Sequence, residues 1–139
     1  MITQNLCTVF KTNLLKGAEN FTLATPYTYK IALYDANATL GADTNTYTTS
    51  HEITGTGYTA GGRTLVIVPP ISSGTTAFVT FNNVTWNPAN FSANAALIYN
   101  ATTGAAVAVL NFGETKTAVS TFTVTFPTAD ASNAIIRIS

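Results

Sequence analysis

Charged residues are scarce in this sequence. Only 9% of the 139 residues are Asp, Glu, Lys or Arg, six basic and six acidic, whereas roughly a quarter of an ordinary soluble domain is charged. The basic residues form no patch, which argues against direct binding of nucleic acid. Surfaces that stay in water usually carry charge, while the cores of protein interfaces are depleted in it. We therefore expect much of the surface to be covered by other proteins.

Residues that carry catalytic or metal chemistry are also few. The chain has one cysteine, Cys7, and one histidine, His51, and its six carboxylates are scattered. A structural zinc site needs four Cys or His ligands, and a catalytic thiol needs a nearby base. His51 and Glu52 are sequence neighbours and would face opposite sides of a strand. The sequence thus predicts no enzyme, no metal site and no cofactor, and Cys7 is interpreted as a small buried hydrophobe.

Long apolar runs and targeting signals are missing as well. No stretch approaches the roughly 18 apolar residues of a membrane helix, so no membrane contact is predicted. The start, Met1–Asn5, has neither a basic stretch nor a long apolar run. We therefore expect no signal peptide.

The first segment has the spacing of a short amphipathic helix. Leu6, Phe10 and Leu14 are four residues apart, which places them on one helical face. The predicted helix covers about 4–16, and Gly17 is a stop signal. A helix of this length is marginal alone in water, so it must dock on the domain or on a neighbouring subunit.

After Pro26 the apolar residues alternate with a period of two, which is typical of strands. Turn residues separate the apolar runs, with hairpins indicated at 72–75 and 100–104, and Pro69-Pro70 is expected to close one run. The predicted fold is mainly β: an antiparallel two-sheet sandwich or jelly-roll-like barrel with one N-terminal helix, in a single domain spanning 1–139. The expected strands are 29–34, 64–68, 77–81, 95–99, 105–112, 121–126 and 134–138.

Residues 35–62 form a long polar stretch between two predicted strands. Loops of this length inside a domain are usually functional or have structure of their own, so we expect an extended arm with one short strand near 51–54. The run Gly55–Gly62 lacks the Gly-Lys-Ser/Thr ending of a phosphate-binding loop. We interpret it as a turn-rich loop.

Several blocks of the sequence resemble those of small virion structural proteins of tailed bacteriophages. The resemblance covers nearly the whole chain and rests on Lys30–Tyr47, Glu52–Gly62, Val84–Trp86, Ala96–Asn100, Ala106–Gly113, Phe126–Asp130, Ile135–Ile138 and the opening Met1–Cys7. It implies a location in the virion, after synthesis in the host bacterial cytoplasm, and brings no catalytic residue with it.

The resemblance leaves three functions open. The first is a capsid decoration, or cement, protein that clamps the major capsid protein as a homo-oligomer, for which the extended arm offers a contact. The second is a neck, tail or fibre-attachment protein that contacts other virion proteins, and the third is a receptor- or glycan-binding module. Trp86 and Tyr58 suit either a sugar platform or a core position. The residues expected to carry the interactions are Leu6, Phe10, Leu14, Tyr47, Tyr58, Arg63 and Trp86.

Overall fold

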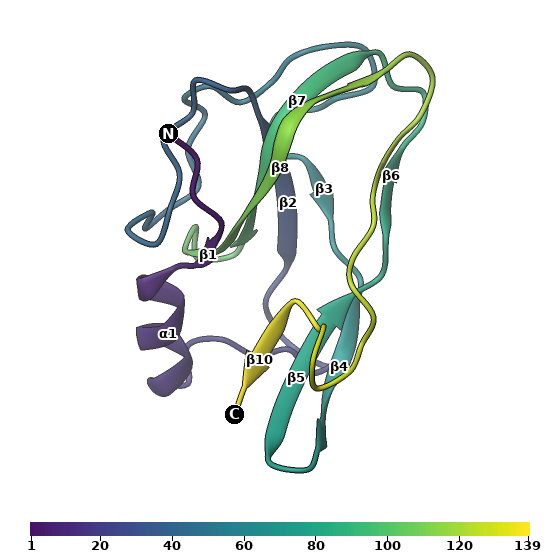
Figure 1. Ribbon diagram of the computed structural model, residues 1–139. Helices are drawn as coiled ribbons and strands as arrows, with labels where there is room; N and C mark the ends of the chain where they lie inside the picture. Colours follow the sequence, from purple (N-terminus) through teal and green to yellow (C-terminus); the bar gives the residue numbers. More distant parts are fainter.

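A computed structural model describes residues 1–139. The protein is mainly β, with antiparallel sheets in a sandwich-like arrangement and one N-terminal helix, as the sequence predicts (Figure 1). The helix is α1 (Thr8–Leu15), and the strands are β1 (Asn5–Leu6), β2 (Tyr29–Tyr34), β3 (Arg63–Thr64), β4 (Ile67–Ser73), β5 (Thr76–Phe81), β6 (Val84–Trp86), β7 (Phe91–Asn100), β8 (Ala106–Ala118), β9 (Phe122–Val124) and β10 (Ile136–Ile138).

The largest sheet has the strand order β1-β8-β7-β2-β3. Its centre is β7, which pairs with β8 on one side and β2 on the other. Residues Ala95–Asn100 are all buried, because a central strand is covered on both faces and reads as a continuous apolar run. The turn predicted at 100–104 joins β7 to β8, and Gly104 adopts a positive φ of 85° there.

Two smaller sheets complete the fold, with orders β10-β5-β4 and β6-β9. The hairpin predicted at 72–75 joins β4 to β5. The expectation that Pro69-Pro70 ends the preceding strand is wrong, because β4 runs through both prolines. The register shifts between Val68 and Ile71, and β4 is an edge strand, so neither proline has to donate a ladder hydrogen bond.

One apolar core of 33 buried residues joins all three sheets. Aromatic rings make several of the contacts. The ring centroids of Phe91 in β7 and Phe122 in β9 are 5.2 Å apart, and those of Phe21 and Phe81 of β5 are 6.1 Å apart. Cys7 belongs to this core and is fully buried, as expected, and burial raises the pKa of its thiol to about 11.

The N-terminal helix is shorter than the sequence pattern predicts. Asn5 and Leu6 pair with Val109 and Ala108 of β8, so the chain starts as a strand, and α1 begins at Thr8. For Asn5 and Leu6, backbone hydrogen bonds to the free edge of β8 replace those of a first helical turn. The stop at Gly17 is confirmed, because Gly17 takes a φ of 73° and the Ala18 N–H donates to the Asn13 carbonyl, a helix end that favours glycine.

The polar stretch 35–62 contains no strand and does not project as an arm. It folds back on the large sheet through single bridges, including Tyr34 with Glu52 and Thr56 with Asn90. Its few apolar residues explain this, because Ala38, Leu40 and Ile53 are buried in the core. The short strand expected near 51–54 is reduced to two hydrogen bonds at the end of β2: the Ile53 N–H donates to the Leu33 carbonyl of β2, and the N–H of Asp35, which follows β2, donates to the His51 carbonyl.

Candidate interaction surfaces

The residues expected to carry interactions fall into two separate groups. Leu6, Phe10 and Leu14 lie on β1 and α1, while Tyr47, Tyr58, Arg63 and Trp86 come from the 35–62 segment, β3 and β6. We call the first region, α1 with the β10-β5-β4 sheet, the helix end. We call the second, the 35–62 segment with β2, β3 and β7, the tyrosine end.

At the helix end, the predicted stripe is not an exposed face of α1. Leu6 is half-buried in β1, Phe10 is buried and Leu14 is half-buried against the core. Phe10 and Leu14 instead form one wall of a small apolar groove of about 120 Å³. We call it the helix groove; its lining is Phe10, Leu14, Phe21, Pro70, Ala77, Phe78, Val79, Ile136 and Ile138.

Exposed apolar side chains belong to the same elements as the groove. Leu15 is 91% exposed at the end of α1, Ile71 on β4 is 59% exposed and Ile138 on β10 is 55% exposed. Strand β10 pairs only with β5, so one of its edges has no strand partner (Figure 1). The sequence pattern does not place β4 and β10 in this surface, because only the fold brings residues 67–73 and 136–138 beside residues 8–15.

The tyrosine end is organised by one carboxylate, Glu52. Its two oxygens accept hydrogen bonds of 2.5 Å from the hydroxyls of Tyr47 and Tyr58, and Oε2 also accepts from the Gly61 N–H at 2.8 Å. The Tyr58 hydroxyl in turn accepts from the Leu33 N–H of β2 at 2.9 Å. We call Tyr47, Tyr58, Tyr99 and Glu52 the tyrosine cluster.

Tyr99 of β7 completes the cluster. Its hydroxyl donates to the Gly61 carbonyl at 2.6 Å, and its ring stacks on that of Tyr47 with centroids 4.6 Å apart. Burial raises the pKa of Tyr99 to about 12, with a smaller contribution from the Glu52 charge. Burial also raises the pKa values of Tyr47 and Tyr58, and their hydrogen bonds to Glu52 raise them further. The hydroxyls therefore stay protonated and act as donors that tie the segment to the sheet.

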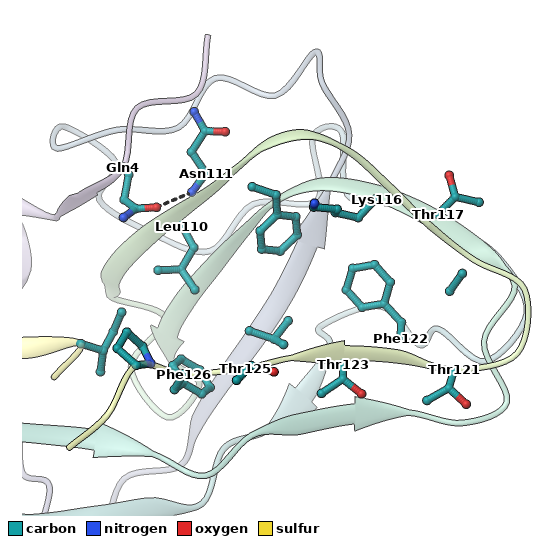
Figure 2. Close-up of a pocket in the computed structure, with 15 residues that line it drawn as sticks. Gln4, Leu110, Asn111, Lys116, Thr117, Thr121, Phe122, Thr123, Thr125 and Phe126 are labelled. Carbon is teal, nitrogen blue, oxygen red and sulfur yellow. Dashed lines mark hydrogen bonds between the residues drawn. The ribbon is translucent and has the colours of Figure 1, made fainter. Parts of the chain in front are cut away.

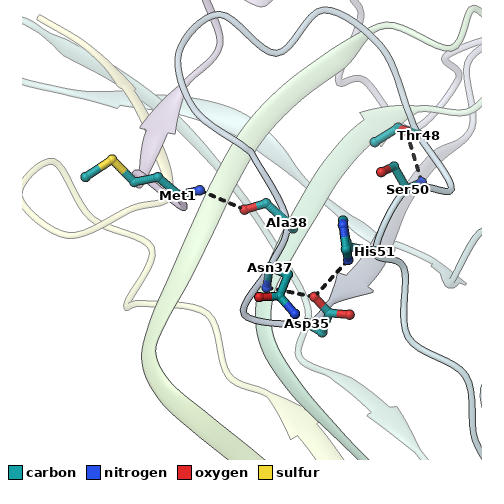
Figure 3. Close-up of polar contacts among 7 residues, drawn as sticks. All are labelled: Met1, Asp35, Asn37, Ala38, Thr48, Ser50 and His51. Carbon is teal, nitrogen blue, oxygen red and sulfur yellow. Dashed lines mark hydrogen bonds and ion pairs between the residues drawn. The ribbon is translucent and has the colours of Figure 1, made fainter.

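The start of the 35–62 segment is held by backbone and local contacts (Figure 3). The amino group of Met1 donates to the Ala38 carbonyl at 3.1 Å, and the Asp35 carboxylate accepts from the Asn37 N–H at 2.8 Å. His51 Nδ1 lies 3.4 Å from Asp35 Oδ1, with both side chains nearly half exposed. An ion pair this open to water contributes little to stability, so these contacts shape the loop more than they stabilise it.

Trp86 and Arg63 have different surroundings from each other. The Trp86 ring is 2% exposed and packs beside Tyr58, Phe91 and Phe122. It is a core aromatic, and its face is closed to sugar stacking. Arg63 is exposed on β3, and its guanidinium donates to the Thr85 carbonyl of β6.

A larger groove that the sequence analysis did not anticipate lies between β8 and β9 (Figure 2). It measures about 490 Å³ and its only charged lining residue is Lys116. Phe112 and Phe122 project into it from the two strands, with ring centroids 6.2 Å apart, and the Asn111 N–H donates to Gln4 Oε1 at 3.0 Å. It escaped prediction because its walls come from the chain start, from 110–127 and from Ile135.

Uncharged polar pairs cover the outward faces of the neighbouring strands. Ser92 and Thr117 lie 2.8 Å apart, Asn94 donates to Thr115 at 2.9 Å, and Thr85 lies 3.0 Å from Thr123. Such cross-strand pairs stabilise sheets modestly. On β7 and β8 the exposed Glu114–Lys116 pair is the charged contact beside them.

No family model, no curated protein and no solved structure matches the chain. No cluster of three or more His, Cys, Asp or Glu side chains able to hold a metal ion is present. None of the helical structure is both long enough and apolar enough to cross a membrane.

Proposed function

We propose that this chain is a structural virion protein of a tailed bacteriophage that decorates the capsid shell and stabilises it through protein–protein contacts. The observation that carries the proposal is the helix groove with its exposed apolar surroundings. The side chains of Leu15, Ile71 and Ile138 are exposed to solvent on the elements that form the groove. Exposed apolar surface of this kind marks interaction sites.

The groove suits an extended apolar segment of the major capsid protein. None of its lining residues is charged, so a charged partner would lose its hydration without compensation. The unpaired edge of β10 offers backbone donors and acceptors beside it, and an added strand uses such an edge. A single contact of this size is weak. When an oligomer makes several such contacts with the shell at once, avidity strengthens its binding.

The sequence supports the phage assignment through its resemblance to virion proteins, and the low charge supports a surface covered by partners. The 35–62 segment is not available as a free arm for these contacts, because the tyrosine cluster ties it to the sheet. The neck, tail or fibre-attachment role stays the alternative, since the same groove would serve there.

Copy number in purified particles tests the proposal. Hundreds of copies per virion are expected for shell decoration, measured by quantitative mass spectrometry against the major capsid protein. A dozen copies or fewer would move the protein to the neck or tail. Absence from purified virions would overturn the assignment.

A surface substitution tests the groove. Leu15→Lys should leave the thermal midpoint nearly unchanged, within about 0.5 kcal/mol in stability, because the side chain is exposed and a cation suits a helix C-terminus. It should nevertheless lower the occupancy of the protein on shells in a reconstitution assay. Val119→Lys is the matched control, since Val119 is 80% exposed, directly follows β8 and does not line the helix groove. Equal occupancy for Leu15→Lys, Val119→Lys and the unmodified protein would contradict docking through the helix groove.

Deletion of residues 1–17 is a poor test of the helix groove. Cys7 and Phe10 belong to the core and β1 pairs with β8. The deletion would damage the fold together with the surface, so point substitution is the better probe.

A further inference from the structure

A second cavity, polar and distinct from the helix groove, lies where the glycine-rich loop meets β3 and the end of β6. It measures about 430 Å³, within the roughly 300–1,000 Å³ range of small-molecule sites, and is open to solvent. Its hydrogen-bonding side chains are those of Thr59, Arg63, Thr64 and Asn87. We call it the Arg63 cavity.

Close backbone contacts fix the walls of the cavity. A Cβ on Gly57 would lie 1.8 Å from the Pro88 carbonyl oxygen, and a Cβ on Gly62 would lie 1.8 Å from the Ile31 carbonyl oxygen. Both glycines have positive φ values, 88° and 79°. Only glycine allows the loop to approach so closely, so the cavity is preformed and does not depend on loop closure.

The lining offers donors without a matching acidic group. Arg63 is the only charged residue in it, and no carboxylate lies within 4 Å of its guanidinium. The guanidinium donates to the Thr85 carbonyl alone, which leaves most of its five N–H groups free. The two threonine hydroxyls and the Asn87 amide add further donors.

Trp86 is the one aromatic residue of the lining. It is 2% exposed, and its Nε1 is buried, closed to solvent and without a hydrogen-bond partner in the protein. The indole therefore senses the cavity as a neighbour, and Arg63 carries the contact with a bound acceptor.

We propose that the Arg63 cavity binds an acidic sugar, with its carboxylate on Arg63 and its ring hydroxyls on the threonine and asparagine groups. A guanidinium fork matches a planar carboxylate through two parallel hydrogen bonds. A single positive charge suits a monoanion better than a phosphate dianion. The cavity is wider than a lone carboxylate needs, and its uncharged polar lining suits hydroxyl groups. This inference is independent of shell decoration and goes beyond it.

Trp86 makes the site directly observable, because it is the only tryptophan of the chain. The protein labelled with ¹⁵N is titrated with glucuronate, and the indole N–H signal is followed by NMR. Glucose is the matched neutral sugar and acetate the matched carboxylate. We expect a saturable shift with glucuronate, weaker binding at high salt because the charges are near the surface, and much weaker shifts with glucose and acetate.

Variants locate the contact. Arg63→Gln should weaken glucuronate binding roughly tenfold or more, since it removes a charge-assisted bidentate contact. Arg137→Gln, an exposed arginine on β10, should bind as the unmodified protein does. The thermal midpoint of each variant confirms that it is folded, and the ligand comparison on the unmodified protein stands without any variant.

Three results would overturn the proposal. Equal affinity for glucose would remove the carboxylate from the recognition. Equal affinity for acetate would remove the sugar and leave a carboxylate site that acidic side chains of a partner protein could fill. No shift with any of the three would mean that the cavity holds only water.

Discussion

The two ends of this molecule are both poor in charge, but they differ in how their surfaces are satisfied. At the tyrosine end, a polar segment of 28 residues folds back and satisfies its hydrogen bonds internally through Glu52 and the tyrosine hydroxyls. At the helix end, apolar side chains and an unpaired strand edge stay exposed. Apart from the Arg63 cavity, the first end satisfies its own polar groups, whereas the second leaves apolar surface uncovered. Binding of large partners is therefore expected at the end whose interactions are incomplete.

Glycine substitution should separate the two ends most strongly. Gly62→Ala at the tyrosine end would place Cβ 1.8 Å from the Ile31 carbonyl oxygen at a φ of 79°, and would cost about 4 kcal/mol or prevent folding. Gly74→Ala, in the β4–β5 hairpin of the helix end, has a φ of 60° with open space around it and should cost only about 1 kcal/mol. Urea denaturation measures both. Similar losses for the two variants would contradict the close packing inferred for the loop.

Removal of the Glu52 charge should have the next largest effect. Glu52→Gln keeps the shape but cannot accept from Tyr47, Tyr58 and Gly61 together, because one of its two terminal atoms becomes a donor. We expect a loss of about 2 kcal/mol, and faster amide hydrogen exchange in 47–61 than in β4 and β5. Glu114→Gln is the matched control, since Glu114 is exposed and bonds only Lys116, and its denaturation midpoint should not change. An unchanged midpoint for Glu52→Gln would mean that the tyrosine cluster does not hold the segment.

The smallest effect concerns Glu19, between the two ends. Its Oε1 accepts from Tyr29 and Asn100, and its Oε2 is buried without a partner. Burial raises the pKa of this carboxyl above its ordinary value of 4.5, against hydrogen bonds that lower it. Between 4.5 and the raised value the folded state binds more protons than the unfolded state, so this group makes stability fall as pH rises through that window.

Glu19→Gln should remove that dependence. Glutamine keeps the acceptor for Tyr29 and Asn100 and carries no charge to desolvate, so the variant should gain on the order of 1 kcal/mol at neutral pH. Stability curves between pH 4 and 8 measure it. A variant less stable than the unmodified protein at pH 7, or one with the same pH slope, would show that the buried charge is stabilised by contacts beyond these two.

Part of the fold follows from local pattern. Alternation in 29–34 and 121–126 predicted β2 and β9, and Asn100–Gly104 predicted the β7–β8 turn, because a period of two and positive-φ glycine are properties of neighbouring residues. Local pattern was wrong where a distant partner competes. Leu6 has helical spacing with Phe10 but pairs with Ala108, about a hundred positions along the chain. Pro69 and Pro70 look like a strand end but fit an edge strand.

The candidate surfaces show the same division. The sequence alone determined a mainly β protein with little charge and few titratable groups, because composition and spacing are local quantities. Only the tertiary structure decided that Trp86 is buried, that the 35–62 segment is tied down by Glu52, and that α1 meets β10 in an apolar groove. These outcomes depend on contacts between residues far apart in the chain, and no local pattern encodes which distant group will fill a position.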